Sequence, residues 1–539
     1  MLLGERWMRE PSNPTRAARR RPFRSQPVRL GPRSIIDAMP SPALNSFYWH
    51  DYETFGTDSK RDRPSQFAGL RTTLDLEPLG EPLAIFCKPA LDVLPNPEAC
   101  LLTGITPQQA QRDGVIEAEF AARIHDELAA PGTCGVGYNS IRFDDEFTRN
   151  LFYRNFYEPY TREWDNENSR WDIIDLARLA YALRPEGVEW PLREDNKPSF
   201  RLGDLTTANH LTHAQAHDAL SDVYATLALA RLLKRAQPRL WHFYFALRRK
   251  RQAFTFLDYV HRKPVLHVSS RYPAERGNLA IVVPLAAHPD QHNCVIVYDL
   301  DADPTPLLEL DAEAIADRVF TSKANLPDGC ERIPLKAVHA NKSPALAPLS
   351  VLQGANTQRI KLDVGRCEKH LDMLRNAADL GEKVRRVFAS TRDESSIDSE
   401  LAIYRGFVED ADKRLLREVR RTPPAELGQR KFGFRDARYP ELLFRYRARN
   451  WPETLSAAEH ERWQEFRHDR LHDAGALTAL TLVDYFAQIA ALRAREGVQQ
   501  ALLDQLETWG HHLAADTATD HVQSLLLQSD VHVPARAGA

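Results

Sequence analysis

The sequence is poor in the features that mark membrane-bound, secreted and polycationic proteins. No run of about 18 or more apolar residues occurs in its 539 residues, so no membrane span is expected. None of the six cysteines forms a C-x-x-C pair, which argues against a zinc site or a redox motif. No apolar signal-peptide core precedes them, so we expect reduced thiols in a cytoplasmic protein. The net charge is only −3, so any binding to phosphate has to be local.

The length of the chain predicts several domains, because one compact core rarely exceeds about 250–300 residues. Hydrophobic residues make up 43% of the sequence, which is enough for ordinary globular cores. Changes in local pattern divide the chain into four expected parts. These are an extension over residues 1–45, an α/β domain over 46–236, a β-rich domain over 237–390 and, after a polar linker, a helical domain over 397–520.

The extension differs from the rest because it holds nine arginines against three acids, together with repeated prolines. It shows no helical or strand period, which is typical of disorder. Three interpretations compete: a nucleic-acid-binding arm, an organelle transit peptide and an incorrectly chosen start. We favour the last, because the pattern of a folded domain begins directly after Met39.

Strand and helix patterns alternate in the first domain, which predicts an α/β fold with helices on both faces of a sheet. Thr106 and Pro107 are typical of a helix start, as cap and first residue. We expect strands at 47–53, 83–87 and 134–138, and helices at 117–129, from Asp144 onward and at 218–235. Further strands are expected at 265–269, 279–284 and 294–299, and helices dominate from the linker to about residue 515.

Asp51 and Glu53 form the first candidate site. They are two residues apart in an aromatic strand, so both side chains point to the same face. Adjacent carboxylates repel each other unless a cation lies between them. A site rich in oxygen ligands favours Mg²⁺ or Mn²⁺ over Zn²⁺.

Three further residues extend this candidate site. Asp144 enters a predicted helix, where it could act as a cap, unless Asp145 or Glu146 takes that role. His217 and Asp222 are five residues apart, so they approach each other only if His217 lies in the loop before the helix. A lone histidine is more often a hydrogen-bonded core residue, but this one belongs to an ordered set with four acids.

The ordered set of Asp51, Glu53, Asp144, His217 and Asp222 resembles the DEDDh group of 3′→5′ exonucleases. The resemblance implies that the four acids bind two Mg²⁺ ions, for which Mn²⁺ can substitute, and that His217 is the general base. Two such ions stabilise the attacking and leaving oxygens of a phosphodiester hydrolysis. A histidine can accept a proton near neutral pH. The product would be a nucleoside 5′-monophosphate.

Motifs outside the site extend the likeness. Residues 47–56, 63–68, 149–157, 182–187 and 443–450 resemble the bacterial exodeoxyribonuclease I family, and the likeness runs from about 46 to about 515. It implies a ribonuclease H-like (DnaQ-like) exonuclease domain, a Src-homology-3-like β-barrel domain and a C-terminal helical domain. It also implies a monomer that degrades single-stranded DNA processively in repair and recombination. Substrate contacts are implied for Glu53, Thr54, Thr103, Ile105 and Arg201, and contacts with the acidic tail of single-strand-binding protein for Arg184 and Lys263.

Two segments mix basic and aromatic residues, residues 234–251 and 444–451. Such mixtures are typical of surfaces that track phosphates and stack bases. The other interpretation is that the aromatics belong to helix cores and the charges to solvated faces. Two other functions also stay open, an RNA-trimming exonuclease of the same chemistry and a non-catalytic scaffold. All five site residues are present, which argues against the scaffold.

Overall fold

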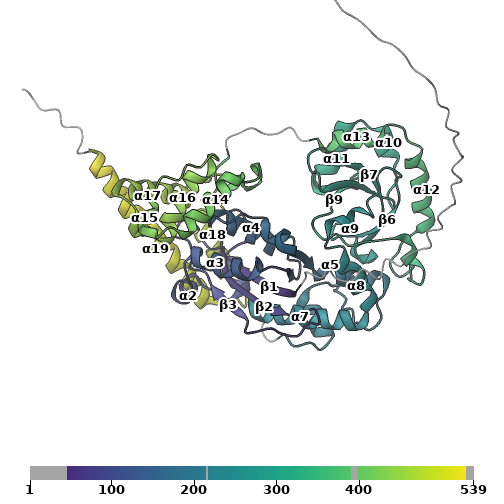
Figure 1. The fold of residues 1–539 in the computed structure, drawn as a ribbon, viewed down its shortest axis with the longest axis horizontal. Helices are drawn as coiled ribbons and strands as arrows, with labels where there is room; N and C mark the ends of the chain where they lie inside the picture. The colour runs from purple at the N-terminus through teal and green to yellow at the C-terminus, as the bar shows by residue number, and fades with distance from the viewer. Residues whose placement is uncertain (1–44, 214–216, 390–396, 530–539) are drawn as a thin grey trace, which may run out of the picture. The chain divides into compact units, whose positions relative to one another are not determined.

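The computed structural model describes residues 45–213, 217–389 and 397–529, with side chains described up to residue 517 (Figure 1). The predicted extension, apart from Asn45, lies outside the described residues, as do the polar linker and the last ten residues. Within the described ranges, no helix is both long and apolar enough to cross a membrane.

The first part of the described chain contains one five-stranded sheet with the order β3-β2-β1-β4-β5. Its strands are β1 (Ser46–Thr54), β2 (Pro64–Thr72), β3 (Leu83–Phe86), β4 (Thr133–Gly137) and β5 (Ser169–Asp172). Its helices are α1 (Pro97–Thr103), α2 (Pro107–Asp113), α3 (Glu117–Leu128), α4 (Asp144–Arg154), α5 (Ile173–Leu183), α6 (Leu202–Ala208), α7 (Ala219–Ala236), α8 (Pro238–Ala246) and α9 (Lys250–Phe254). The predicted α/β fold class is confirmed.

Connection length explains the mixed direction of the strands. Short connections join β1, β2 and β3, which are antiparallel, whereas β1, β4 and β5 are parallel and are joined through helices. Side chains alternate along β1. Tyr48 and Tyr52 pack in a cluster with α3 and α4, and Phe47 and Trp49 pack in the cluster that includes α7. Asp51 therefore follows the α7 side of the sheet.

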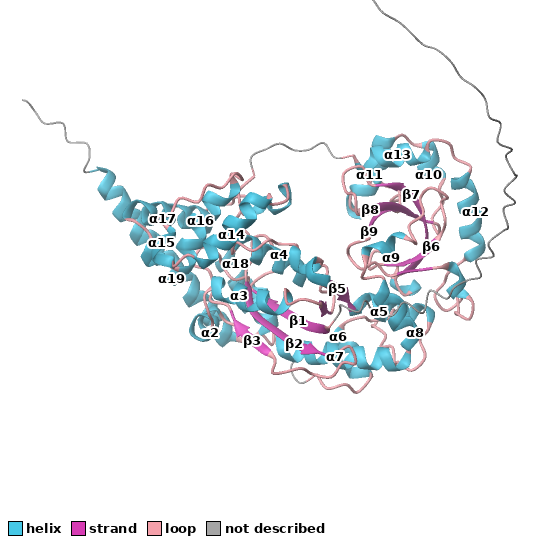
Figure 2. Cartoon of the chain, viewed as in Figure 1, coloured by secondary structure: helices cyan, strands magenta, loops and turns pink. Residues whose placement is uncertain are grey.

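The second part contains a separate five-stranded sheet, with the order β10-β6-β7-β8-β9 and antiparallel pairing throughout (Figure 2). Its strands are β6 (Val265–Val268), β7 (Leu279–Ala287), β8 (Cys294–Asp299), β9 (Leu335–His339) and β10 (Leu346–Ala347). Helices α10 (Thr305–Glu309), α11 (Ala312–Phe320), α12 (Val364–Arg375) and α13 (Leu380–Phe388) accompany it, so this part is more helical than its sequence pattern predicted.

The third part is helical, as predicted. It consists of α14 (Asp410–Arg421), α15 (Pro424–Leu427), α16 (Arg438–Asn450), α17 (Ala457–His472), α18 (Leu482–Arg493) and α19 (Gln500–Ser529). Two apolar clusters join it to the first part. In one, Ile105 packs with Tyr485 and Leu506, and in the other, Phe156 packs with Tyr439.

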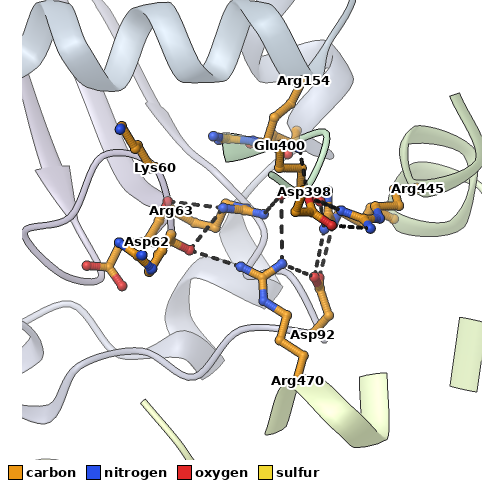
Figure 3. Close-up of polar contacts among 12 residues, drawn as sticks. Lys60, Asp62, Arg63, Asp92, Arg154, Asp398, Glu400, Arg445 and Arg470 are labelled. Atoms are coloured by element: carbon orange, nitrogen blue, oxygen red, sulfur yellow. Dashed lines mark hydrogen bonds and ion pairs between the residues drawn. The ribbon is translucent and has the colours of Figure 1, made fainter. Parts of the chain in front are cut away.

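A buried ionic network also joins the first and third parts (Figure 3). Glu400 accepts from Arg63 at 2.9 Å, from Arg445 at 3.1 Å and from Arg449 at 2.6 Å. Asp92 accepts from Arg449 at 2.8 Å and from Arg470 at 2.7 Å. All six of these side chains are buried.

This network corrects the nucleic-acid interpretation of residues 444–451. Arg445, Arg447 and Arg449 are buried in ion pairs with carboxylates, so they cannot track phosphates at the surface. The aromatic residues of 234–251 are also core residues rather than a base-stacking surface, because Trp241, Tyr244 and Phe245 lie in the hydrophobic core. Arg248 is also buried.

Glu400→Gln is expected to destabilise the fold by about 3–5 kcal/mol, because it leaves buried arginines without their counter-charge. Urea unfolding measures this change. Glu409→Gln is the matched control, since Glu409 is 67% exposed and pairs with Arg435 at 3.6 Å. An exposed pair contributes at most about 1 kcal/mol. Equal effects of the two substitutions would contradict the assigned role of the network.

Candidate active site

The site lies where β1, α4 and α7 meet. Its cavity has a volume of about 770 Å³ and is lined by all five residues of the ordered set, Asp51, Glu53, Asp144, His217 and Asp222. Ligand atoms of Glu53, His217 and Asp222 lie within 4.8 Å of one another. The constellation predicted from the sequence is therefore gathered around one cavity.

The end of β1, where Asp51 and Glu53 lie, departs from regular strand pairing. A register shift lies between Glu53 and Thr54, where β1 pairs with β2. Such irregularities often occur beside active sites, because they redirect side chains. On β2, the Gln66 amide donates to Asp218 Oδ1 at 3.1 Å, and its oxygen accepts from Ala219 N at 3.1 Å. Gln66 thus ties the start of α7 to the sheet beside Glu53.

Asp144 and Asp145 have opposite environments although they are neighbours. Asp144 is the first residue of α4, and its Oδ1 accepts from Tyr52 N at 3.1 Å. Asp145 is buried between Arg162 at 2.5 Å and Arg170 at 2.7 Å, which holds its pKa well below the usual range. The cap position belongs to Phe143, so Asp144 is no cap and its carboxylate faces the cavity.

The loop before α4 is fixed by Asp172. Its carboxylate accepts from Asn139 N at 2.8 Å and from Ile141 N at 3.2 Å, and it also caps α5 through Ile174 N. These bonds hold the chain that delivers Asp144 to the site. Asn139 itself lines the cavity, in the left-handed backbone region with φ of 62°.

The pKa values of all four carboxyl groups are raised. Burial is the largest cause for each, and neighbouring carboxylates add to it for Asp51, Glu53 and Asp144. Glu53 reaches a pKa of about 8. Among the described residues, no arginine or lysine forms an ion pair with Asp51, Glu53 or Asp144. Crowded acids without a cationic partner fit divalent metal ions, which would supply the missing charge.

Stability of the metal-free protein should fall as the pH rises. Glu53 loses its proton near 4.5 in the unfolded chain but only near 8 in the folded one, so ionisation favours unfolding between these values. Glu53→Gln should therefore be increasingly more stable than the unsubstituted chain from pH 5 to pH 8. Melting temperatures in EDTA measure this difference. A constant difference across the pH range would contradict the raised pKa.

His213 is a site residue that the sequence analysis missed. Its Nε2 lies 2.5 Å from Asp222 Oδ1, and its Nδ1 lies 3.2 Å from Thr206 Oγ1. Asp222 thus has a histidine partner nine residues before it, in addition to His217, which is exposed, has φ of 64° and offers a ligand atom within 4.8 Å of that of Asp222. No spacing rule singles out His213, because its contact with Asp222 depends on the tertiary fold.

The other predicted substrate contacts divide into two groups. Thr54 and Thr103 line the cavity, together with the exposed Leu102. Ile105 is buried in the cluster with Tyr485, and Arg201 is exposed at the residue before α6. Neither residue lines the cavity. Leu492 and Arg495, from the third part of the chain, also line it. Neither could be predicted as a site residue, since both lie almost 400 residues after Leu102 in the chain.

Three family models match this chain. An exonuclease model matches residues 48–230, the exonuclease I SH3-like domain matches 248–390 and the exonuclease I C-terminal domain matches 397–513. The predicted combination of a ribonuclease H-like domain, an SH3-like domain and a helical domain is confirmed.

Curated relatives and solved structures agree with these three family models. Exodeoxyribonuclease I of Escherichia coli is 47% identical over 424 residues, which cover 78% of this chain and 89% of that one. Exodeoxyribonuclease I of Haemophilus influenzae is 45% identical, over 79% of this chain and 90% of that one. Exonuclease I of Methylocaldum szegediense has a TM-score of 0.84 at 51% identity, over 87% of this chain and 100% of that one. E. coli exonuclease I in complex with a dA16 oligonucleotide has a TM-score of 0.83 at 44% identity, with the same coverage. The chain therefore belongs to the exonuclease I family.

Proposed function

We propose that this chain hydrolyses the 3′-terminal phosphodiester bond of single-stranded DNA and releases nucleoside 5′-monophosphates. Asp51, Glu53, Asp144 and Asp222 would hold two Mg²⁺ ions, with Mn²⁺ as a substitute, and His217 would be the general base. The observation that carries the proposal is the gathering of four carboxyl groups with raised pKa and one histidine around one cavity. Exodeoxyribonuclease activity itself follows from the family.

The residues of the site would divide the reaction between them. Bound divalent ions supply charge stabilisation for the attacking and leaving oxygens. The exposed His217 imidazole can accept the proton of the attacking water and pass it to solvent. Thr54, Thr103 and Leu102 line the cavity on the side of β1 and α1, where they can position the terminal nucleotide.

Two structures of E. coli exonuclease I support a single-stranded DNA substrate, since they contain dA16 and dT13 oligonucleotides. A zinc-bound form of that protein with single-stranded DNA supports a metal site. Mg²⁺ as the working ion, in a cytoplasmic protein that acts in repair and recombination, is part of our proposal. The six free cysteines agree with a reducing compartment.

The acidic tail of single-strand-binding protein remains the proposed protein partner of a monomeric enzyme. Of the two predicted contacts, Lys263 is exposed, and Arg184 already donates to the backbone carbonyls of Val351 at 3.1 Å and Gln353 at 3.2 Å. Lys263 is therefore the side chain better able to meet a carboxylate directly.

A gel time course on 5′-labelled single-stranded DNA with Mg²⁺ tests the substrate, beside the same sequence as RNA and as blunt duplex. Shortening of the single-stranded DNA alone, from its 3′ end, is the expected result. Preferential loss of the RNA would assign the chain to the RNA-trimming alternative, because the 2′-hydroxyl is the group by which a protein tells RNA from DNA. Absence of cleavage with both Mg²⁺ and Mn²⁺ would overturn the proposed function.

A further inference from the structure

Four arginines line a hollow on the third part of the chain. This arginine pocket has a volume of about 520 Å³, and its basic residues are Arg414, Arg417, Arg421 and Arg430. All four are exposed, and the only acid among the lining residues is Glu418. None of these residues lines the cavity of the candidate active site. The pocket is therefore a second, strongly positive feature that the proposed reaction does not use.

The residue pattern of α14 places three of these arginines on its outer face. Leu416 is buried in one of the apolar clusters that join the first and third parts. Arg414, Arg417 and Arg421 follow one another at helical spacing, so they share a face and span about 10 Å along the axis. Arg430, which comes after α15, lines the pocket from a second segment. The positive charges therefore surround one hollow and do not form an extended stripe.

Three of the four guanidinium groups have no carboxylate partner within the part of the chain that the structure describes. Arg430 forms an ion pair with Glu418. The side chains of Arg414, Arg417 and Arg421 form neither an ion pair nor a hydrogen bond with any described residue. The donors of these three groups are thus available to an anion from solution.

A neighbouring side chain experiences the positive charge of the pocket. The guanidinium carbon of Arg420 lies 3.7 Å from the centroid of the Tyr157 ring. Burial is the largest cause of the lowered pKa of Arg420, the two tyrosines Tyr157 and Tyr446 raise it, and the charges of Arg417 and Arg421 lower it again. Cations that lie this close repel one another, and a bound anion would relieve the repulsion.

We propose that the arginine pocket binds a compact polyphosphate, either inorganic or the triphosphate group of a nucleotide. Planar guanidinium groups bind phosphate oxygens in pairs, and adjacent phosphates concentrate negative charge as the pocket concentrates positive charge. The volume is in the range of small-molecule sites, about 300–1,000 Å³. An acidic peptide fits less well, because no large apolar or aromatic side chain lines the pocket to anchor it.

Calorimetric titration of the full chain with sodium tripolyphosphate tests this proposal. Metal-free buffer of low ionic strength keeps divalent ions, and phosphate held by them, out of the active site. We expect one tripolyphosphate per chain, and roughly 10- to 100-fold weaker binding in Arg417→Gln, which loses a charged hydrogen-bond donor. Glu418→Gln should bind several-fold more tightly, because it removes the acid of the pocket and releases Arg430. Arg386→Gln is the matched control, since Arg386 is an exposed arginine in the last turn of α13.

A parallel titration with ATP separates the two sources of polyphosphate. Binding of ATP as tight as that of tripolyphosphate, or tighter, would support the site and assign it to nucleoside triphosphates. Binding of ATP at least tenfold weaker would support it and assign it to inorganic polyphosphate. Absence of binding by both, or equal effects of Arg417→Gln and Arg386→Gln, would overturn the proposal and leave the arginines as a solvated helix face. None of these results depends on DNA cleavage, so the proposed function stands or falls separately.

Discussion

Replacing Asp51 by asparagine is expected to lower the rate of single-stranded DNA cleavage by about three orders of magnitude or more. Asp51 lies on β1 near Glu53, Asp144 and Asp222. Burial is the largest cause of its raised pKa, and the charges of these three neighbours raise the pKa further. Removing one carboxylate should weaken the hold on divalent ions, and those ions contribute several kcal/mol to a transition state of this kind. Each 1.36 kcal/mol corresponds to a factor of ten in rate. Cleavage under single-turnover conditions measures the loss.

The same variant should fold and bind DNA normally. Its melting temperature in EDTA should even rise, because one buried, repelling acid has been removed. Asp75→Asn is the matched control, since Asp75 is an exposed acid 3.1 Å from Lys234. It should cleave at the unsubstituted rate. Loss of DNA binding in parallel with activity in Asp51→Asn would contradict a role in metal binding.

Replacing His217 by alanine is expected to slow the chemical step by about 10²–10⁴-fold, which is the usual contribution of a general base. The metal affinity should change little, because the four carboxylates remain. His217 is exposed at the edge of the cavity, where it can reach both the attacking water and solvent. Rapid-quench kinetics at saturating Mg²⁺ measure the step.

His213→Ala provides the contrast that assigns the base. The His213 ring contacts Asp222 Oδ1 through Nε2 and Thr206 Oγ1 through Nδ1, so it positions the Asp222 carboxylate. Its loss should weaken metal affinity, and high Mg²⁺ should restore much of the rate. His217→Ala should not be rescued in this way. If saturating Mg²⁺ rescued His217→Ala and left His213→Ala slow, the two roles would be reversed.

The acids of the site could be predicted from the sequence because local geometry decides where they point. A strand of period two places Asp51 and Glu53 on one face, and the cap Asp218 begins α7 so that Asp222 falls in its first turn. The helix start at Thr106 was predicted on the same local grounds, and Thr106 accepts from Gln109 N at 3.2 Å. The sequence analysis made no prediction of the strand directions in the first sheet, which depend on the length of the connections.

Contacts between distant residues could not be predicted. Arg449 pairs with Asp92 across 357 residues, and nothing near Arg449 in the sequence distinguishes a buried ion pair from a phosphate contact. The same limit explains Arg495, which lines the cavity from the third part of the chain, and the burial of Ile105 in a cluster with Tyr485 and Leu506. Residue type alone left both interpretations of the basic segments open.

The number of divalent ions bound by the full chain tests the central claim most directly. Mn²⁺ titration followed by calorimetry, in the presence of a nucleoside 5′-monophosphate, measures this number in the unsubstituted chain and in Asp51→Asn. Our account predicts two ions per chain, and weaker binding with at most one ion in the variant. Equal binding by both proteins, or no binding by either, would contradict a metal site built from Asp51, Glu53, Asp144 and Asp222.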